Sequence, residues 1–167
     1  GRQEMINEFE KHLHSYVKEN VEGHIVVEPH APMEDVLERA SAAEAESREK
    51  YESRLLERLG DEIGSRARGI SGMQGVLNVQ RKGQIDTLLV HEEFATKGFY
   101  CTECNYMTIR KEEKCPLDDN QLRRTPDIVD NLINDVIKQG ASVEMIATDM
   151  SDFDDIAAFL RFPIKQR

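Results

Sequence analysis

Three cysteines within fifteen residues are the feature that most constrains this chain. Cys101 and Cys104 form a C-x-x-C pair, and Cys115 begins a second turn in the pattern C-x-x-D, which ends at Asp118. A C-x-x-C turn can present both thiolates to one metal ion, and a second turn further along the chain can complete a tetrahedron. Because carboxylate oxygen also binds zinc, the pattern predicts a structural Zn²⁺ held by Cys101, Cys104, Cys115 and Asp118.

The fourth ligand and the use of the cysteines leave alternatives open. Asp119, His91 or a water molecule could take the place of Asp118, and the three cysteines could also be free thiols in a loop. A thioredoxin-like redox pair is disfavoured because no strand-to-helix context precedes the C-x-x-C pair. A catalytic deaminase zinc is disfavoured as well, since the Pro that its motif requires before the first Cys is missing.

Charge bears on the kind of partner. The chain of 167 residues carries 32 acidic and 22 basic residues, a formal net charge of -10. Long-range electrostatics therefore oppose binding to naked nucleic acid and favour a protein partner. No run of about 18 apolar residues predicts a membrane span, and the first residues lack a secretory signal pattern. We expect a soluble, cytoplasmic protein without a membrane partner.

Hydrophobic periodicity predicts an order of elements. Helices are expected at residues 3–20, 33–62 and 72–81, and a further helix is expected to begin with Thr125 as N-cap and to end at Gly140. The expected strands span residues 24–28, 85–90, 142–147 and 157–162, and a turn or short helix capped by Ser151 precedes the last of them. From residue 72 onward this alternation predicts an α/β fold, with helices on both faces of a largely parallel sheet.

Four segments together resemble archaeal and eukaryotic class-I peptide-chain release factors and Pelota. Residues 83–90, GQIDTLLV, resemble the family's GAVDTLLI segment, and Cys101-x-x-Cys104 with Cys115-Pro116 is similar to the zinc-binding insertion of the archaeal members. Residues 139–146, QGASVEMI, resemble the GA-VEIIS strand, and residues 156–162, IAAFLRF, resemble the terminal GIAAILRY. The order matches the family, although Asp118 stands where the family has its fourth Cys.

The resemblance implies a fold and a domain division. Residues 63–167 would form a three-layer α/β/α sandwich of the kink-turn-binding ribosomal-protein type, with a zinc-ribbon insertion at 98–120. Residues 1–62, a helical and strand remnant, would be the end of the family's middle domain and a long connecting helix.

The resemblance also implies a function. In the family this C-terminal domain docks a translational GTPase, and peptide release belongs to a Gly-Gly-Gln loop that this sequence lacks. The expectation is therefore a non-enzymatic interaction module of a translation termination or ribosome-rescue protein, with a translational GTPase or the ribosome as partner. An RNA-binding module of kink-turn type and a zinc-dependent hydrolase are the alternatives.

Overall fold

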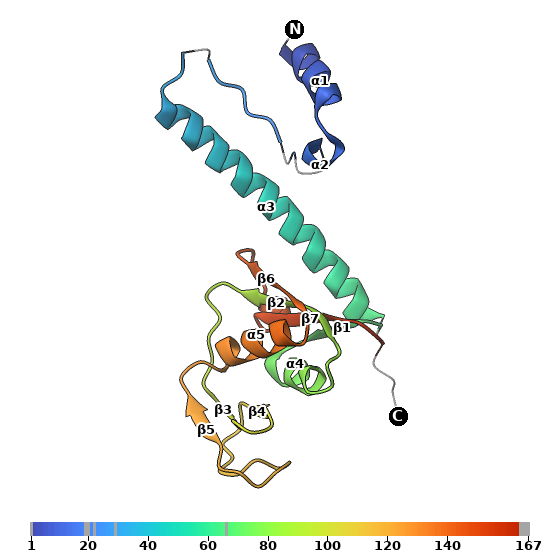
Figure 1. Cartoon of the computed structure of the whole chain (residues 1–167), viewed down its shortest axis with the longest axis vertical. Helices are drawn as coiled ribbons and strands as arrows, with labels where there is room; N and C mark the ends of the chain where they lie inside the picture. Colours follow the sequence, from blue (N-terminus) through green and yellow to red (C-terminus); the bar gives the residue numbers. More distant parts are fainter. Residues whose placement is uncertain (1, 19–20, 22, 29, 66, 164–167) are drawn as a thin grey trace. The chain divides into compact units, whose positions relative to one another are not determined.

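The computed structural model describes residues 2–18, 21, 23–28, 30–65 and 67–163, and the chain divides into two compact units, Gly1–Tyr51 and Glu52–Arg167 (Figure 1). Within the described residues, no helix combines the length and the apolarity that a membrane crossing requires. The two units are described separately.

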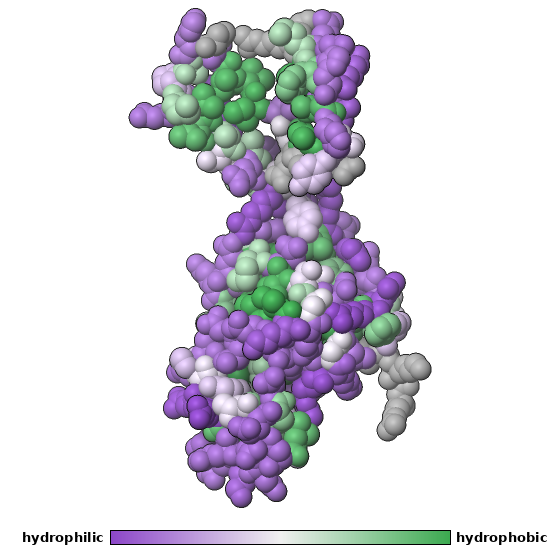
Figure 2. Space-filling view, viewed as in Figure 1, coloured by the Kyte–Doolittle hydropathy of each residue, from purple (hydrophilic) through white to green (hydrophobic). Residues whose placement is uncertain are grey.

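The first unit contains α1 (Arg2–His12), α2 (Ser15–Lys18) and the first part of α3 (Met33–Gly64). The segment between α2 and α3 contacts both α1 and α3, and His24 Nε2 lies 2.9 Å from Glu10 Oε1 of α1. Arg39 also donates a 2.9 Å hydrogen bond to the carbonyl oxygen of Val26. Apolar side chains remain exposed here (Figure 2), including those of Met5, Phe9, Tyr16, Val17, Val26, Met33 and Leu37. Such a surface is typical of a segment that packs against further protein.

The second unit is built on a four-stranded sheet in the order β1-β7-β2-β6. Its elements are β1 (Gly69–Ser71), α4 (Met73–Gln80), β2 (Ile85–His91), α5 (Ile128–Lys138), β6 (Ser142–Ile146), the 3-10 helix η1 (Ser151–Phe153) and β7 (Ile156–Leu160). Strands β2 and β6 are parallel, whereas β7 runs antiparallel to both β2 and β1.

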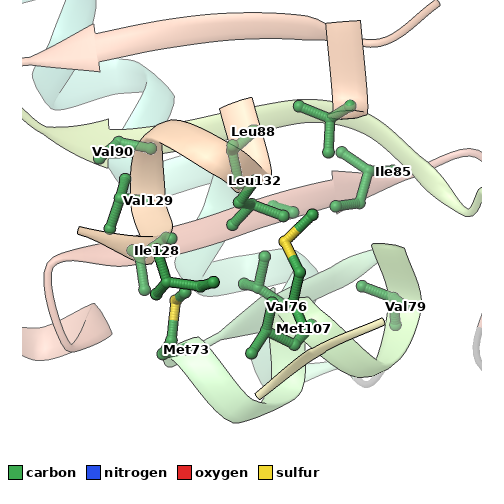
Figure 3. Close-up of a cluster of buried hydrophobic side chains, with 14 of the residues drawn as sticks. Met73, Val76, Val79, Ile85, Leu88, Val90, Met107, Ile128, Val129 and Leu132 are labelled. Atoms are coloured by element: carbon green, nitrogen blue, oxygen red, sulfur yellow. The ribbon is translucent and has the colours of Figure 1, made fainter. Parts of the chain in front are cut away.

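Helices cover both faces of this sheet. On one face, α4 and α5 pack against β2 and β7 in a buried cluster that includes Val76, Leu88, Ile128, Leu132 and Ile156 (Figure 3). On the other face, the last turns of α3 supply Leu56 and Leu59, which pack with Leu89, Ile146 and Phe159. Full burial of each such side chain contributes about 1.5–3 kcal/mol, so the sheet is fixed from both sides.

A second, three-stranded sheet forms the insertion between β2 and α5. It consists of β3 (Gly98–Tyr100), β4 (Met107–Thr108) and β5 (Arg123–Thr125) in the order β4-β3-β5. Its root lies against the main domain: a Cβ placed on Gly98 would come within 2.7 Å of Ile128 Cβ at the start of α5. The insertion therefore extends from a closely packed base.

The long helix α3, helices α4 and α5 and strand β2 confirm the sequence predictions, but four other predictions were wrong. The predicted helix 3–20 is interrupted, since α1 ends at His12, and residues 19–20 lie outside the described residues. The predicted strand at residues 24–28 is not a strand, because no neighbouring backbone pairs with it among the described residues. The sheet is mixed rather than largely parallel, because β7 returns between β1 and β2. The last strand was predicted at residues 157–162, but β7 spans Ile156–Leu160 and ends two residues earlier.

Two predicted helix caps were also wrong. Asp127, not Thr125, caps α5, and its Oδ1 accepts a 2.9 Å hydrogen bond from the backbone N–H of Val129. Thr125 instead donates through its hydroxyl to the carbonyl oxygen of Asp127. Ser151 is the first residue of η1 rather than its cap, and the Asp149 carboxylate accepts from its N–H. An aspartate just outside a helix is a better acceptor than the hydroxyl that the sequence pattern favoured.

Candidate metal centre

The two cysteine-containing turns of the insertion have the same backbone geometry. In the first turn, the N–H of Cys101 donates a 2.8 Å hydrogen bond to the carbonyl oxygen of Tyr106. In the second, the N–H of Cys115 donates a 2.8 Å bond to the carbonyl oxygen of Asn120, again five residues ahead. We call these turns the first knuckle (residues 101–106) and the second knuckle (residues 115–120).

The knuckles also share a left-handed residue at the same position. Asn105 and Asp119 each have a φ of 56°, and each directly follows the last of the two candidate ligands of its knuckle. Asn and Asp tolerate this region better than other residues with a side chain, because their short polar groups bond to nearby backbone. The sequence pattern of the cysteines did not reveal this requirement.

The two knuckles bring the four predicted ligands together. One ligand atom from each of Cys101, Cys104, Cys115 and Asp118 lies within 4.8 Å of every other. The Cys104 and Cys115 sulfurs are 3.4 Å apart, and the Cys101 sulfur lies 3.4 and 3.6 Å from the two Asp118 oxygens. A tetrahedron with zinc–sulfur bonds of about 2.3 Å has edges of about 3.8 Å, so this cluster could hold a metal ion of that size.

The electrostatics of the cluster favour the binding of a cation. Desolvation, together with contacts to Cys115, Asp118 and Cys101, raises the pKa of the Cys104 thiol to about 12. A hydrogen bond from Cys115 holds the pKa of the Asp118 carboxyl well below its usual range. Without a metal, the Cys104 thiol therefore keeps its proton. A divalent cation would displace this proton and bind the cysteines as thiolates.

The four side chains would fill every position of a tetrahedral site, and this limits the chemistry that the site could support. Three sulfurs and one carboxylate supply the four positions of a structural zinc site, whereas a catalytic site keeps one position for water or substrate. Among the described residues, neither His91 nor Asp119 belongs to the cluster. We call these four side chains the metal clasp, because one bound ion would join the two knuckles through them.

A buried polar network connects the first knuckle to helices α4 and α5. Asn105 donates a 3.1 Å side-chain hydrogen bond to Oδ1 of Asp135, which is 7% exposed on α5. Its other oxygen, Oδ2, accepts from Gln80 on α4 and from Gln139. In addition, the guanidinium of Arg81 lies 5.0 Å from the centre of the Tyr106 ring. The sequence analysis missed this network, although a carboxylate between Leu132 and Val136 on the apolar face of a helix is a signal that could have indicated it.

Comparison with solved structures shows which known fold this chain has. No protein-family model matches the chain, and a search of curated proteins finds no significant match. The C-terminal domain of a peptide chain release factor from Methanosarcina mazei superposes with a TM-score of 0.58 at 19% identity, over 83% of this chain and 99% of that one. The chain has the fold of a release-factor C-terminal domain.

Pelota shares this release-factor-type fold. Archaeoglobus fulgidus Pelota superposes with a TM-score of 0.56 at 22% identity, over 86% of this chain and 40% of that one, so this chain spans less than half of Pelota. A weaker likeness, with a TM-score of 0.49 and 17% identity, is to an archaeal Pelota in a model of the ribosome-bound protein with ABCE1.

Proposed function

We propose that this chain is the C-terminal interaction module of a release-factor-like protein in translation termination or ribosome rescue. The observation that carries the proposal is the match to 99% of a release-factor C-terminal domain. The order of the four sequence landmarks supports the same relationship. In this proposal residues 63–167 are the C-terminal domain, of kink-turn-binding type, and residues 1–62 are the end of a middle domain. The exposed apolar residues of α1 support that last assignment.

The proposed partners are a translational GTPase and the ribosome. The module itself performs no catalytic step in this proposal, because peptide release in the family depends on a Gly-Gly-Gln loop. Its role is to bring a partner to the ribosome through the surface of the α/β domain.

The insertion is proposed to be a zinc ribbon with Cys101, Cys104, Cys115 and Asp118 as ligands of one structural Zn²⁺. The ion would supply the positive charge that joins the two knuckles, since the insertion has only short strands and the small buried cluster around Leu122. Metal binding is then part of the folding free energy of this segment.

Affinity capture tests the proposal. The tagged full chain, loaded with zinc, is incubated with cell extract in the presence of a non-hydrolysable GTP analogue or of GDP, and bound proteins are identified by mass spectrometry. The expected result is enrichment of ribosomal proteins and of a translational GTPase over a tagged, unrelated protein of equal net charge. A parallel nuclease-treated extract separates direct GTPase binding from capture through ribosomes. Enrichment of neither class would contradict the proposal.

RNA binding is the second candidate, and one observation favours it. The insertion carries five exposed basic residues, namely Arg110, Lys111, Lys114, Arg123 and Arg124. The chain as a whole carries a net charge of -10, which opposes phosphate binding. An affinity for a folded RNA that falls steeply with added salt would support this candidate over protein docking.

A further inference from the structure

We propose that Cys104 and Cys115 are an oxidation site, at which a peroxide joins the two knuckles by a disulfide and opens the metal clasp. This inference rests on the proposed zinc site. It assigns the three cysteines unequal roles: Cys104 reacts first, Cys115 resolves, and Cys101 remains a thiol.

Distance selects the pair. The Cys104 and Cys115 sulfurs lie 3.4 Å apart, so a disulfide bond of about 2.05 Å requires them to approach by roughly 1.4 Å. The two cysteines lie at the last ligand of one knuckle and the first ligand of the other. The bridge would therefore close a short loop between two turns that already face each other.

Exposure selects the order of reaction. Cys104 is exposed, whereas Cys101 and Cys115 are only 1% and 0% exposed. Oxidation of a cysteine by peroxide requires a thiolate and access to its sulfur. Zinc would bind all three cysteines as thiolates, so exposure makes Cys104 the one that meets the oxidant. The Cys101 sulfur lies 3.4 Å from an Asp118 oxygen, and its burial keeps it from the oxidant.

The chemistry balances in two steps with hydrogen peroxide as oxidant. The Cys104 sulfur attacks one peroxide oxygen, the O–O bond breaks, and sulfenic acid and one water form. The Cys115 sulfur then attacks the sulfur of that sulfenic acid, the S–O bond breaks, and a second water leaves as the disulfide forms. Two electrons pass from the two cysteine sulfurs to one peroxide. Because zinc would bind these sulfurs as thiolates, the two protons that complete the two waters come from solvent. A thiol reductant reverses the bridge.

The consequence is loss of the clasp. Once bridged, Cys104 and Cys115 are no longer thiolate ligands, and only Cys101 and Asp118 remain. Two ligands are too few for a structural zinc site, which takes four. A single two-electron step is therefore enough to release the metal.

Graded hydrogen peroxide applied to the full zinc-loaded chain tests the inference. Zinc content is measured first, released zinc is followed with a chromophoric chelator, and thiols are then alkylated before peptide mapping. We expect one zinc released per disulfide, a bridge linking Cys104 to Cys115 with the loss of two hydrogens, and an alkylated Cys101. A bridge that includes Cys101, or zinc loss with sulfinic acids and no bridge, would overturn it.

Two variants and the metal-free chain serve as controls for this experiment. Cys101→Ser should still form the bridge and Cys104→Ser should form none, whereas equal bridging in both would contradict the assigned roles. If the chain proves unable to bind zinc, the proposed metal site fails, and mapping of the peroxide-treated metal-free chain still decides whether Cys104 and Cys115 pair.

Discussion

Asn105 donates a 3.1 Å hydrogen bond through its side-chain amide to the carboxylate of Asp135. The donor lies on the first knuckle with a φ of 56°, and the acceptor is buried on α5. Asn105 thus combines two tasks, because it allows the left-handed turn behind Cys104 and fixes that turn to the main domain. The metal clasp and the α/β domain are mechanically connected at this residue.

Substitution of Asn105 separates the two tasks. Asn105→Gly keeps the left-handed turn but loses the hydrogen bond, which should lower the free energy of unfolding by about 1–2 kcal/mol. Asn105→Ala loses the bond and adds about 1 kcal/mol of backbone strain. Urea unfolding measures both. Asn134→Ala, an exposed change on α5, should stay within about 0.5 kcal/mol of the parent, and equal stability of the Gly and Ala variants would contradict the strain argument.

Asp135→Asn should destabilise the domain although the two side chains have nearly the same shape. The carboxylate accepts from three amide groups, those of Asn105, Gln80 and Gln139. An amide in its place would set one NH₂ against another donor, at a cost of about 2–3 kcal/mol. Thermal unfolding compared with that of Asp130→Asn, on the exposed side of the same helix, provides the measurement. Similar effects from both substitutions would mean that the network contributes little.

The role of Asp118 as a ligand predicts opposite effects of two substitutions on zinc affinity. Asp118→Ala removes one of four donors and should weaken binding by more than about tenfold, the loss typical of even an outer-shell partner. Asp118→Cys supplies the thiolate that completes a four-cysteine site and should strengthen binding. Competition with a chromophoric chelator gives both affinities. Asp119→Asn, which keeps a residue suited to its left-handed turn outside the donor set, is the matched control and should leave the affinity unchanged.

Glu52 is expected to be the strongest polar contribution to docking of the last turns of α3. One of its oxygens accepts from the N–H groups of Ala147 and Thr148 and from the Thr148 hydroxyl, at 3.0, 2.8 and 2.8 Å. Glu52→Gln should lower the free energy of unfolding by about 2 kcal/mol, because an amide oxygen accepts these bonds more weakly than a carboxylate. Chemical denaturation against Glu57→Gln, an exposed change one turn later, measures it. A loss no larger than that of the control would show that α3 docks through apolar contacts alone.

Local patterns in the sequence predicted the elements that carry their own signal. Strand β2 is an apolar run, α5 has apolar residues at helical spacing, and the C-x-x-C spacing indicates a metal-binding turn without reference to the rest of the chain. The spacing predicted four candidate ligands, and the structure places these side chains together. Zinc itself stays a prediction.

Features that depend on a distant partner could not be predicted in this way. The antiparallel return of β7 depends on which strand lies beside it, and residues 24–28 have strand-like composition without a described partner strand. The burial of the Asp135 carboxylate depends on hydrogen bonds from Gln80 on another helix and Asn105 on the insertion, residues that are distant in the sequence. The left-handed positions of Asn105 and Asp119 follow from the shared knuckle geometry, which the cysteine spacing does not specify.

The metal clasp and its opening by oxidation both depend on the claim that four side chains bind one zinc ion. X-ray absorption at the zinc edge, combined with metal analysis of the purified full chain, tests this claim most directly. The account predicts one zinc per chain with three sulfur neighbours near 2.3 Å and one oxygen neighbour near 2.0 Å, values typical of such ligands to about 0.2 Å. A chain that binds no zinc, or zinc with fewer than three sulfur neighbours, would contradict it.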